Sequence, residues 1–208
     1  MGSAHPTFLM EDDFLDSIEA RPFYQIIQRK YQDKVARRSG VSYMNHIREG
    51  AFIVRSIYGN DRDLIEAFCL HPLFQNDKLL SQLLADTSDD LALISPRAIV
   101  LGMEYRRIAN SYTIKNKIRN PESIEIGSID KVHKMLVADK IQNKKDFMKY
   151  IYRKHARPSY QKVSQHGLQY FNSWLDRLSV SQDMYDRVVG WVEQSETQQH
   201  QSRSKFKT

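Results

Sequence analysis

Three side chains that can coordinate a metal fall where helical periodicity predicts a buried face. His46 shares a face with Gly50, and His71 follows Phe68 at the end of an apolar stretch. Asp139 continues an apolar stripe further along the chain. A buried aspartate is costly unless it is paired or bound to a metal, so Asp139 needs a partner. Two histidines from other helices could provide one, either directly, in a network that holds helices together, or through a metal ion.

The segments that carry these residues are predicted to be helices. Apolar residues recur at helical spacing over 43 to 58 and over 63 to 71, and Pro72 is expected to break the backbone directly afterwards. Ser128 can cap a long helix that starts at Ile129. Together with the other periodic segments, this pattern predicts an all-α globule of about eight helices.

The bulk composition fits one helical domain. Of the 208 residues, 41% are hydrophobic, and only 8 are glycine and 6 proline, so turn formers are scarce. We expect an N-terminal extension over residues 1–20, a helical domain over 21–193 and a polar, unpatterned tail over 194–208. The net charge of +6 permits a phosphate-bearing partner without requiring one.

Nothing in the sequence indicates secretion or a membrane span. It has no apolar run of about 18 residues, and its first residues lack a basic stretch followed by a long apolar one. The single cysteine, Cys69, lies in an apolar run and cannot form an internal disulfide. We therefore expect a cytoplasmic protein that does not contact a membrane.

Three stretches carry a family resemblance in their order and spacing. They read ARRSGVSYMNH over residues 36 to 46, IEAFCLHPLFQND over 65 to 77 and VHKMLVADKIQNKKDF over 132 to 147. Together they resemble the hydrolase domain of the RelA/SpoT enzymes, which belong to the HD phosphohydrolase superfamily. The resemblance covers roughly residues 20 to 180 and implies an HD-domain-like helical fold.

The resemblance implies a role for each matching residue. His46, His71 and Asp139 match three of the family's four metal ligands, and the divalent metal is usually manganese, Mn²⁺. Four further residues would line the nucleotide pocket or contact the base or phosphates: Arg37, Arg38, Lys140 and Asn143. Family members hydrolyse pyrophosphate from the 3′ position of guanosine tetraphosphate or pentaphosphate, (p)ppGpp, with the help of the metal.

The second stretch departs from the family pattern at three positions. Pro72 stands where the family has a metal-binding aspartate. Gln75 and Asn76 stand where it has the Glu-Asp pair that orients the attacking water. An amide cannot act as a general base. Asp77, one residue further on, could supply a replacement carboxylate if the backbone shifts.

Two interpretations of the site follow from this pattern. The first is a divergent HD-type phosphohydrolase that acts on a polyphosphorylated nucleotide such as (p)ppGpp. It would use His46, His71, Asp139 and a replacement ligand such as Asp77, with Gln75 and Asn76 as further candidates at the catalytic positions. The second is a catalytically silent nucleotide-binding or regulatory module that has lost metal-dependent hydrolysis. The retained histidines and Asp139 favour the first, and the missing carboxylates favour the second.

A basic segment allows a third interpretation. Residues 140–162 contain eight lysines or arginines against one acid, Asp146, and tyrosines are interleaved among them. Such a strip can bind the phosphates of a nucleic acid, so the protein could be nucleic-acid-associated. The alternative is a solvated helix face that includes the rim of the pocket.

Overall fold

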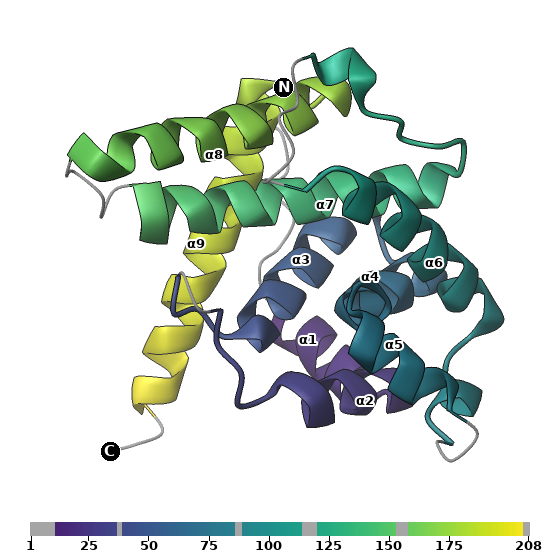
Figure 1. Ribbon diagram of the computed structural model, residues 1–208. Helices are drawn as coiled ribbons and strands as arrows, with labels where there is room; N and C mark the ends of the chain where they lie inside the picture. Colours follow the sequence, from purple (N-terminus) through teal and green to yellow (C-terminus); the bar gives the residue numbers. More distant parts are fainter. Residues whose placement is uncertain (1–10, 37–38, 86–88, 114–119, 153–157, 206–208) are drawn as a thin grey trace, which may run out of the picture.

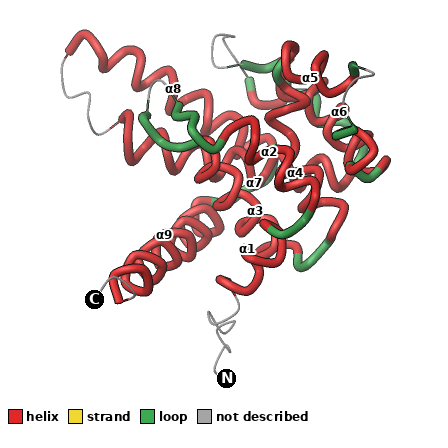
Figure 2. Tube along the Cα trace, turned by 90° about the horizontal axis from the view of Figure 1, so that it is seen from below, coloured by secondary structure: helices red, strands yellow, loops and turns green. Residues whose placement is uncertain are grey.

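The computed structural model describes residues 11–36, 39–85, 89–113, 120–152 and 158–205, and these residues form nine α-helices and no strand (Figure 1). The predicted all-α globule is therefore confirmed, and Figure 2 shows helices joined by loops, with one end of α9 projecting beyond the other helices. The α-helices are α1 (Glu11–Glu19), α2 (Pro22–Tyr31), α3 (Tyr43–Tyr58), α4 (Arg62–Gln75), α5 (Asp77–Leu84), α6 (Pro96–Ser111), α7 (Asp130–Asp146), α8 (Pro158–Arg177) and α9 (Gln182–Lys205). Two 3₁₀ turns, η2 (Leu91–Leu93) and η3 (Pro121–Ser123), and a π-helical segment, η4 (Phe147–Tyr152), complete the elements.

Helices occupy the described parts of both terminal segments that the sequence sets apart, 11–20 and 194–205. Helix α1 lies inside the expected extension, and its Phe14, Leu15 and Ile18 are buried in the main core. Helix α9 continues to Lys205, so most of the expected polar tail is helical. None of the described helices combines the length and the apolar character that crossing a bilayer requires.

Helix α4 is the centre of the globule because it packs against α2, α3 and α6 and also touches α7. Two glycines allow this close packing. The ring of Phe68 in α4 occupies the place where a side chain at Gly50 of α3 would begin, and Phe74 does the same at Gly102 of α6. Helix α7 then lies across α3, α4 and α6 in Figure 1. Three of the helices that meet there carry His46, His71 and Asp139.

Two local expectations were wrong. Helix α4 does not end before Pro72 but continues through it to Gln75. The buried Leu73 and Phe74 explain this, because their packing compensates for the one backbone hydrogen bond that proline removes. Helix α7 begins at Asp130 after Ile129, so Ser128 is not its cap.

The contact between Gly50 and Phe68 yields a stability prediction. Gly50→Ala places a methyl group inside the volume of a fully buried ring, so we expect a net loss of about 1–3 kcal/mol of unfolding free energy. Gly190→Ala, in α9 with no atom near the new methyl group, should be neutral or stabilise by up to about 1 kcal/mol. Chemical denaturation measures both changes, and equal stability of the two variants would contradict this account of α3–α4 packing.

Candidate metal centre

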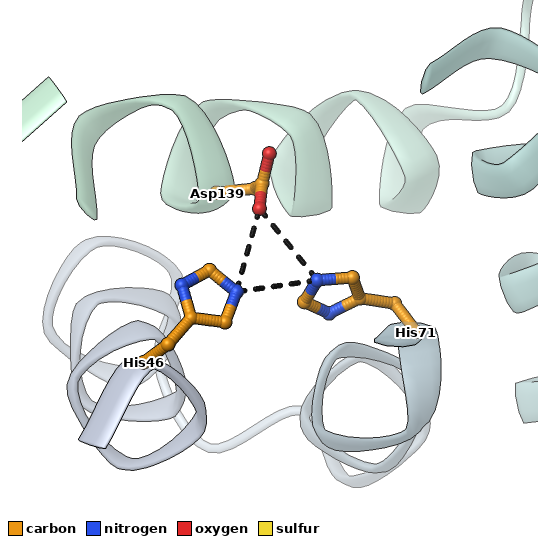
Figure 3. A group of neighbouring side chains, drawn as sticks. All are labelled: His46, His71 and Asp139. Carbon is orange, nitrogen blue, oxygen red and sulfur yellow. Dashed lines mark hydrogen bonds and ion pairs between the residues drawn. The ribbon is translucent and has the colours of Figure 1, made fainter. Parts of the chain in front are cut away.

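The structure brings together His46 from α3, His71 from α4 and Asp139 from α7 (Figure 3). The Nε2 atoms of the two histidines lie 3.3 Å apart. The Oδ1 atom of Asp139 lies 3.6 Å from each of them. Residues that are 25 and 93 positions from His46 in the sequence thus meet at one point, as a group that could hold a metal ion.

The separations of the three atoms suit a divalent ion. Metal bonds of about 2.0–2.1 Å to nitrogen and oxygen in a tetrahedral site separate neighbouring ligand atoms by about 3.4 Å. The observed values of 3.3, 3.6 and 3.6 Å lie close to this spacing. An ion could therefore bind without a rearrangement of the helices, and three protein ligands would leave a coordination position open for water or substrate.

The orientation of His71 depends on the proline beside it. Proline has no backbone N–H, so Pro72 cannot donate the helical hydrogen bond to the carbonyl of Phe68, four residues earlier. The Nδ1 atom of His71 lies 2.5 Å from that carbonyl oxygen. A carbonyl only accepts, so Nδ1 must carry the proton, and neutral His71 has its lone pair on Nε2, which points toward Asp139.

The orientation of His46 is set by a glutamine that the sequence reasoning missed. The Nε2 amide of Gln142 donates to Glu49 at 3.0 Å and to Asp146 at 2.9 Å. Both carboxylates accept only, so the Oε1 atom of Gln142 faces the Nδ1 atom of His46, at 2.5 Å. Neutral His46 therefore also directs its Nε2 lone pair inward. A buried Lys145 pairs with Glu49 at 2.7 Å and balances its charge.

The electrostatics of the group favour a bound cation. Burial lowers the pKa of His71 to about 4, so its imidazole is neutral and able to bind a metal at neutral pH. Burial alone would raise the pKa of Asp139, but Lys140 and the two histidines hold it well below its ordinary range. Two lone pairs and a carboxylate oxygen thus face one another, and a cation between them would satisfy all three.

Lys140 and Asn143 support the carboxylate from the same helix. The Nζ atom of Lys140 donates to Oδ2 of Asp139 at 2.7 Å, and the Nδ2 atom of Asn143 donates to Oδ1 at 2.7 Å. Lys140 is 5% exposed, and its charge lies 4.8 Å from the ring centre of Trp174. Both residues therefore hold Asp139 in place, and both also line a pocket next to the metal group.

A pocket of about 900 Å³ opens above the three residues. Helix α7 forms one wall, and the π-helical η4 and α8 add an apolar side with Phe147, Ile151 and Phe171. Among the described residues that line it, the acids are Asp139 and Asp146. The pocket has the size of a nucleotide-class ligand site, with a few polar groups at one end and aromatic rings at the other.

The other predicted site residues are only partly brought to this pocket. Gln75 lines it and donates to Asn110 at 3.2 Å. Asn76 instead caps α5 by accepting from the backbone of Leu79. Asp77 is exposed and paired with Arg106, and it does not line the pocket, so the structure does not place it as a replacement ligand. Arg37 and Arg38 lie outside the described residues.

The basic strip over 140–162 does not form a continuous exposed face. Lys140, Lys144 and Lys145 are 5%, 7% and 2% exposed. Lys140 and Lys145 pair with buried acids, and Lys144 lies over the ring of Tyr185. Residues 153–157 lie outside the described part of the chain. The first three charges of the strip therefore serve the interior rather than a nucleic-acid surface.

The residues that sequence reasoning missed are those that orient the three central ones. Glu49, Gln142 and Lys145 form one buried polar network, and the ring of Tyr105 packs 4.8 Å from that of His71. Glu49 lies one position before Gly50 in the helix predicted over 43 to 58, and it is buried. An acid next to the apolar face of this helix was the signal that could have revealed the network.

No model of a known protein family matches the chain, and neither curated proteins nor solved structures provide a match. The likeness to the RelA/SpoT hydrolase domain therefore stays a prediction. The chemistry of the site has to be read from its own residues.

The lowered pKa of His71 predicts how stability depends on pH in metal-free protein. Because the folded pKa of about 4 lies below the unfolded value near 6.5, the unfolded chain takes up the proton first as the pH falls. The contribution of His71 is present above about pH 6.5 and is lost toward pH 4. With a chelator present, guanidinium denaturation should give a free energy of unfolding about 2 kcal/mol lower at pH 5 than at pH 7 because of His71.

Two variants isolate this contribution. His71→Gln should lose most of the difference between pH 5 and pH 7, because it has no imidazole to protonate. His133→Gln, a half-buried histidine on α7, should keep it. An unchanged pH dependence in His71→Gln would contradict the account.

Proposed function

We propose that the protein is a divergent, metal-dependent phosphohydrolase of the HD type that acts on a polyphosphorylated nucleotide. The observation that carries the proposal is the convergence of two Nε2 atoms and one carboxylate oxygen at 3.3 to 3.6 Å on the wall of a nucleotide-sized pocket. The family resemblance, to enzymes that hydrolyse (p)ppGpp, supports the same substrate class.

His46, His71 and Asp139 would hold the metal. Two imidazoles and one carboxylate suit first-row divalent ions, and the family resemblance favours Mn²⁺ among them. When bound, such an ion supplies Lewis-acid stabilisation of phosphate charge and makes water more acidic.

The remaining pocket residues would bind and orient the ligand. Phe147, Phe171 and Tyr170 provide rings against which a nucleobase can stack. Asn143 presents an amide beside the metal group, and Lys140 adds a positive charge to the same wall. Because Lys140 is already paired with Asp139, a divalent ion bound at the metal group would supply the positive charge that draws the ligand's phosphates toward α7.

Asp146 is the residue best placed to accept a proton from the attacking water. Gln75 cannot do so, because an amide is no base. Apart from Asp139, Asp146 is the one carboxylate among the described residues that line the pocket. Its Oδ2 atom accepts from Gln142, and its Oδ1 atom is buried 3.5 Å from Lys145. The acid that the family supplies from the loop after His71 would here come from α7.

A catalytically silent nucleotide-binding module is the second candidate. The observation that favours it is the part of the chain that follows His71: Pro72 cannot ligate, Gln75 is neutral and Asn76 caps a helix. Such a module would bind nucleotide and raise the melting temperature without forming product. The nucleic-acid interpretation has no comparable support, since the described start of the basic strip is buried.

The hydrogen bond from His46 to Gln142 predicts a loss of metal affinity. Gln142→Met keeps the size of the side chain but removes the acceptor that orients the imidazole. We expect Mn²⁺ to bind about 10–100-fold more weakly by calorimetric titration, the range typical for groups behind a ligand. Gln169→Met, on an exposed position of α8, is the control. Equal affinities for the two variants would show that Gln142 does not orient the site.

The assignment of Asp146 predicts which acid hydrolysis requires. With Mn²⁺ and a panel of nucleotides that includes (p)ppGpp, Asp146→Asn should lower turnover about 100-fold or more while nucleotide binding persists. Asp77→Asn, outside the pocket, should hydrolyse as the parent protein does. Release of phosphate or pyrophosphate is the readout. Nucleotide binding without turnover in the parent protein would favour the silent module. If metal-free protein binds no divalent ion, the metal centre and the metal-dependent hydrolysis are both contradicted.

A further inference from the structure

A second hollow, of about 690 Å³, adjoins the metal pocket and is lined mainly by residues of α2 and α5. Both helices are labelled in the lower part of Figure 1. The two hollows share three residues, Tyr43, Pro72 and Gln75, so they adjoin at one wall. Four cations line the second one: Arg29, Lys30, Lys34 and Lys78. Within the described part of the chain, no acid lines it.

Within the described part of the chain, three of the four charges in this hollow have no acidic partner. Arg29 pairs with Asp90 at 2.5 Å. Lys30, Lys34 and Lys78 make no ion pair with any described residue, although Lys34 lies 5.1 Å from the ring centre of Tyr31. A concave surface that carries one sign of charge focuses its potential and attracts the opposite sign. The hollow therefore favours anions.

The three departures from the family pattern in the second stretch fall on this surface. Pro72, Gln75 and Asn76 line the basic hollow, and each stands where the family resemblance implies a carboxylate. Three acids at these positions would face four cations and nearly balance them. The proline and the two amides add no negative charge to the lysines, and amide N–H groups can donate to phosphate oxygens.

We propose that the basic hollow is an oxyanion subsite for a phosphate or pyrophosphate group, formed by Lys30, Lys34 and Lys78 and opened by the loss of the three acids. The anion is either a phosphate group of the nucleotide in the adjoining pocket or a free ion. The link to the nucleotide and the replacement of three acids rest on the proposed function, whereas the cluster of lysines does not.

The direct test is calorimetric titration of the whole protein with pyrophosphate in the presence of a chelator. We expect the triple variant Lys30→Gln, Lys34→Gln, Lys78→Gln to bind at least 10-fold more weakly than the parent protein. All three lysines are exposed or half-exposed, so folding should be retained. A control with the same change in charge at exposed positions outside the hollow, Arg21→Gln, Arg62→Gln, Arg187→Gln, should bind as the parent does. Equal losses in the two triple variants, or no binding to the parent, would overturn the subsite.

The single variant Asn76→Asp tests the role of the lost acids. Aspartate is as good a helix cap as asparagine, so α5 should keep its start while the hollow gains one negative charge. Asn76 lines the basic hollow but not the metal pocket. We expect pyrophosphate to bind about 3–10-fold more weakly, because a fixed charge of the same sign repels the anion. An unchanged affinity for pyrophosphate would contradict the placement of Asn76 beside the bound anion.

Two further arms identify the source of the anion. If the subsite holds a phosphate of the nucleotide, the triple lysine variant weakens nucleotide binding and pyrophosphate competes with it. If it holds a free ion, nucleotide affinity is unchanged and both ligands bind together. Asp139→Asn, which removes a metal ligand, should leave pyrophosphate binding intact. Pyrophosphate can therefore bind in a protein that does not hydrolyse nucleotides. Conversely, hydrolysis can be observed in a protein that does not bind pyrophosphate at this hollow.

Discussion

A carboxylate buried in the middle of α7 has to be neutralised, and much of the structure around it follows from that requirement. Asp139 is 3% exposed, and a charge in that position costs several kcal/mol unless it is paired. Lys140 and Asn143 supply hydrogen bonds from α7 itself. The remaining face of the carboxylate is left to His46 and His71, so α3 and α4 must approach α7 closely enough to deliver them.

The approach depends on backbone features more than on the ligands themselves. Gly50 lets the ring of Phe68 lie against α3 and so sets the distance between the helices that carry the two histidines. Pro72 leaves the carbonyl of Phe68 free to accept a hydrogen bond from His71. Gln142, on α7, accepts the corresponding hydrogen bond from His46. Both imidazoles consequently turn their Nε2 atoms toward Asp139. Pro72, which offers no ligand atom of its own, thus helps to orient the imidazole of His71.

Sequence periodicity was enough to place His46, His71 and Asp139 on inward faces, because helical spacing is visible in a single sequence. It failed where three-dimensional packing decides. Pro72 predicted a helix end, but buried neighbours on both sides keep α4 intact. Lys145 appeared to belong to an exposed basic strip, yet it is buried against Glu49, a residue 96 positions away. Pairing of that kind cannot be read from local pattern, and neither can the basic hollow, which collects residues from α2, α4 and α5.

The central claim is that His46, His71 and Asp139 bind one divalent ion. Crystals grown with Mn²⁺ and measured near the manganese absorption edge test it most directly. The account predicts one anomalous peak within about 2.0–2.2 Å of both Nε2 atoms and a carboxylate oxygen of Asp139. An absence of anomalous density there, with the two imidazoles and the carboxylate joined only by hydrogen bonds, would contradict it and leave a structural network in place of a metal centre.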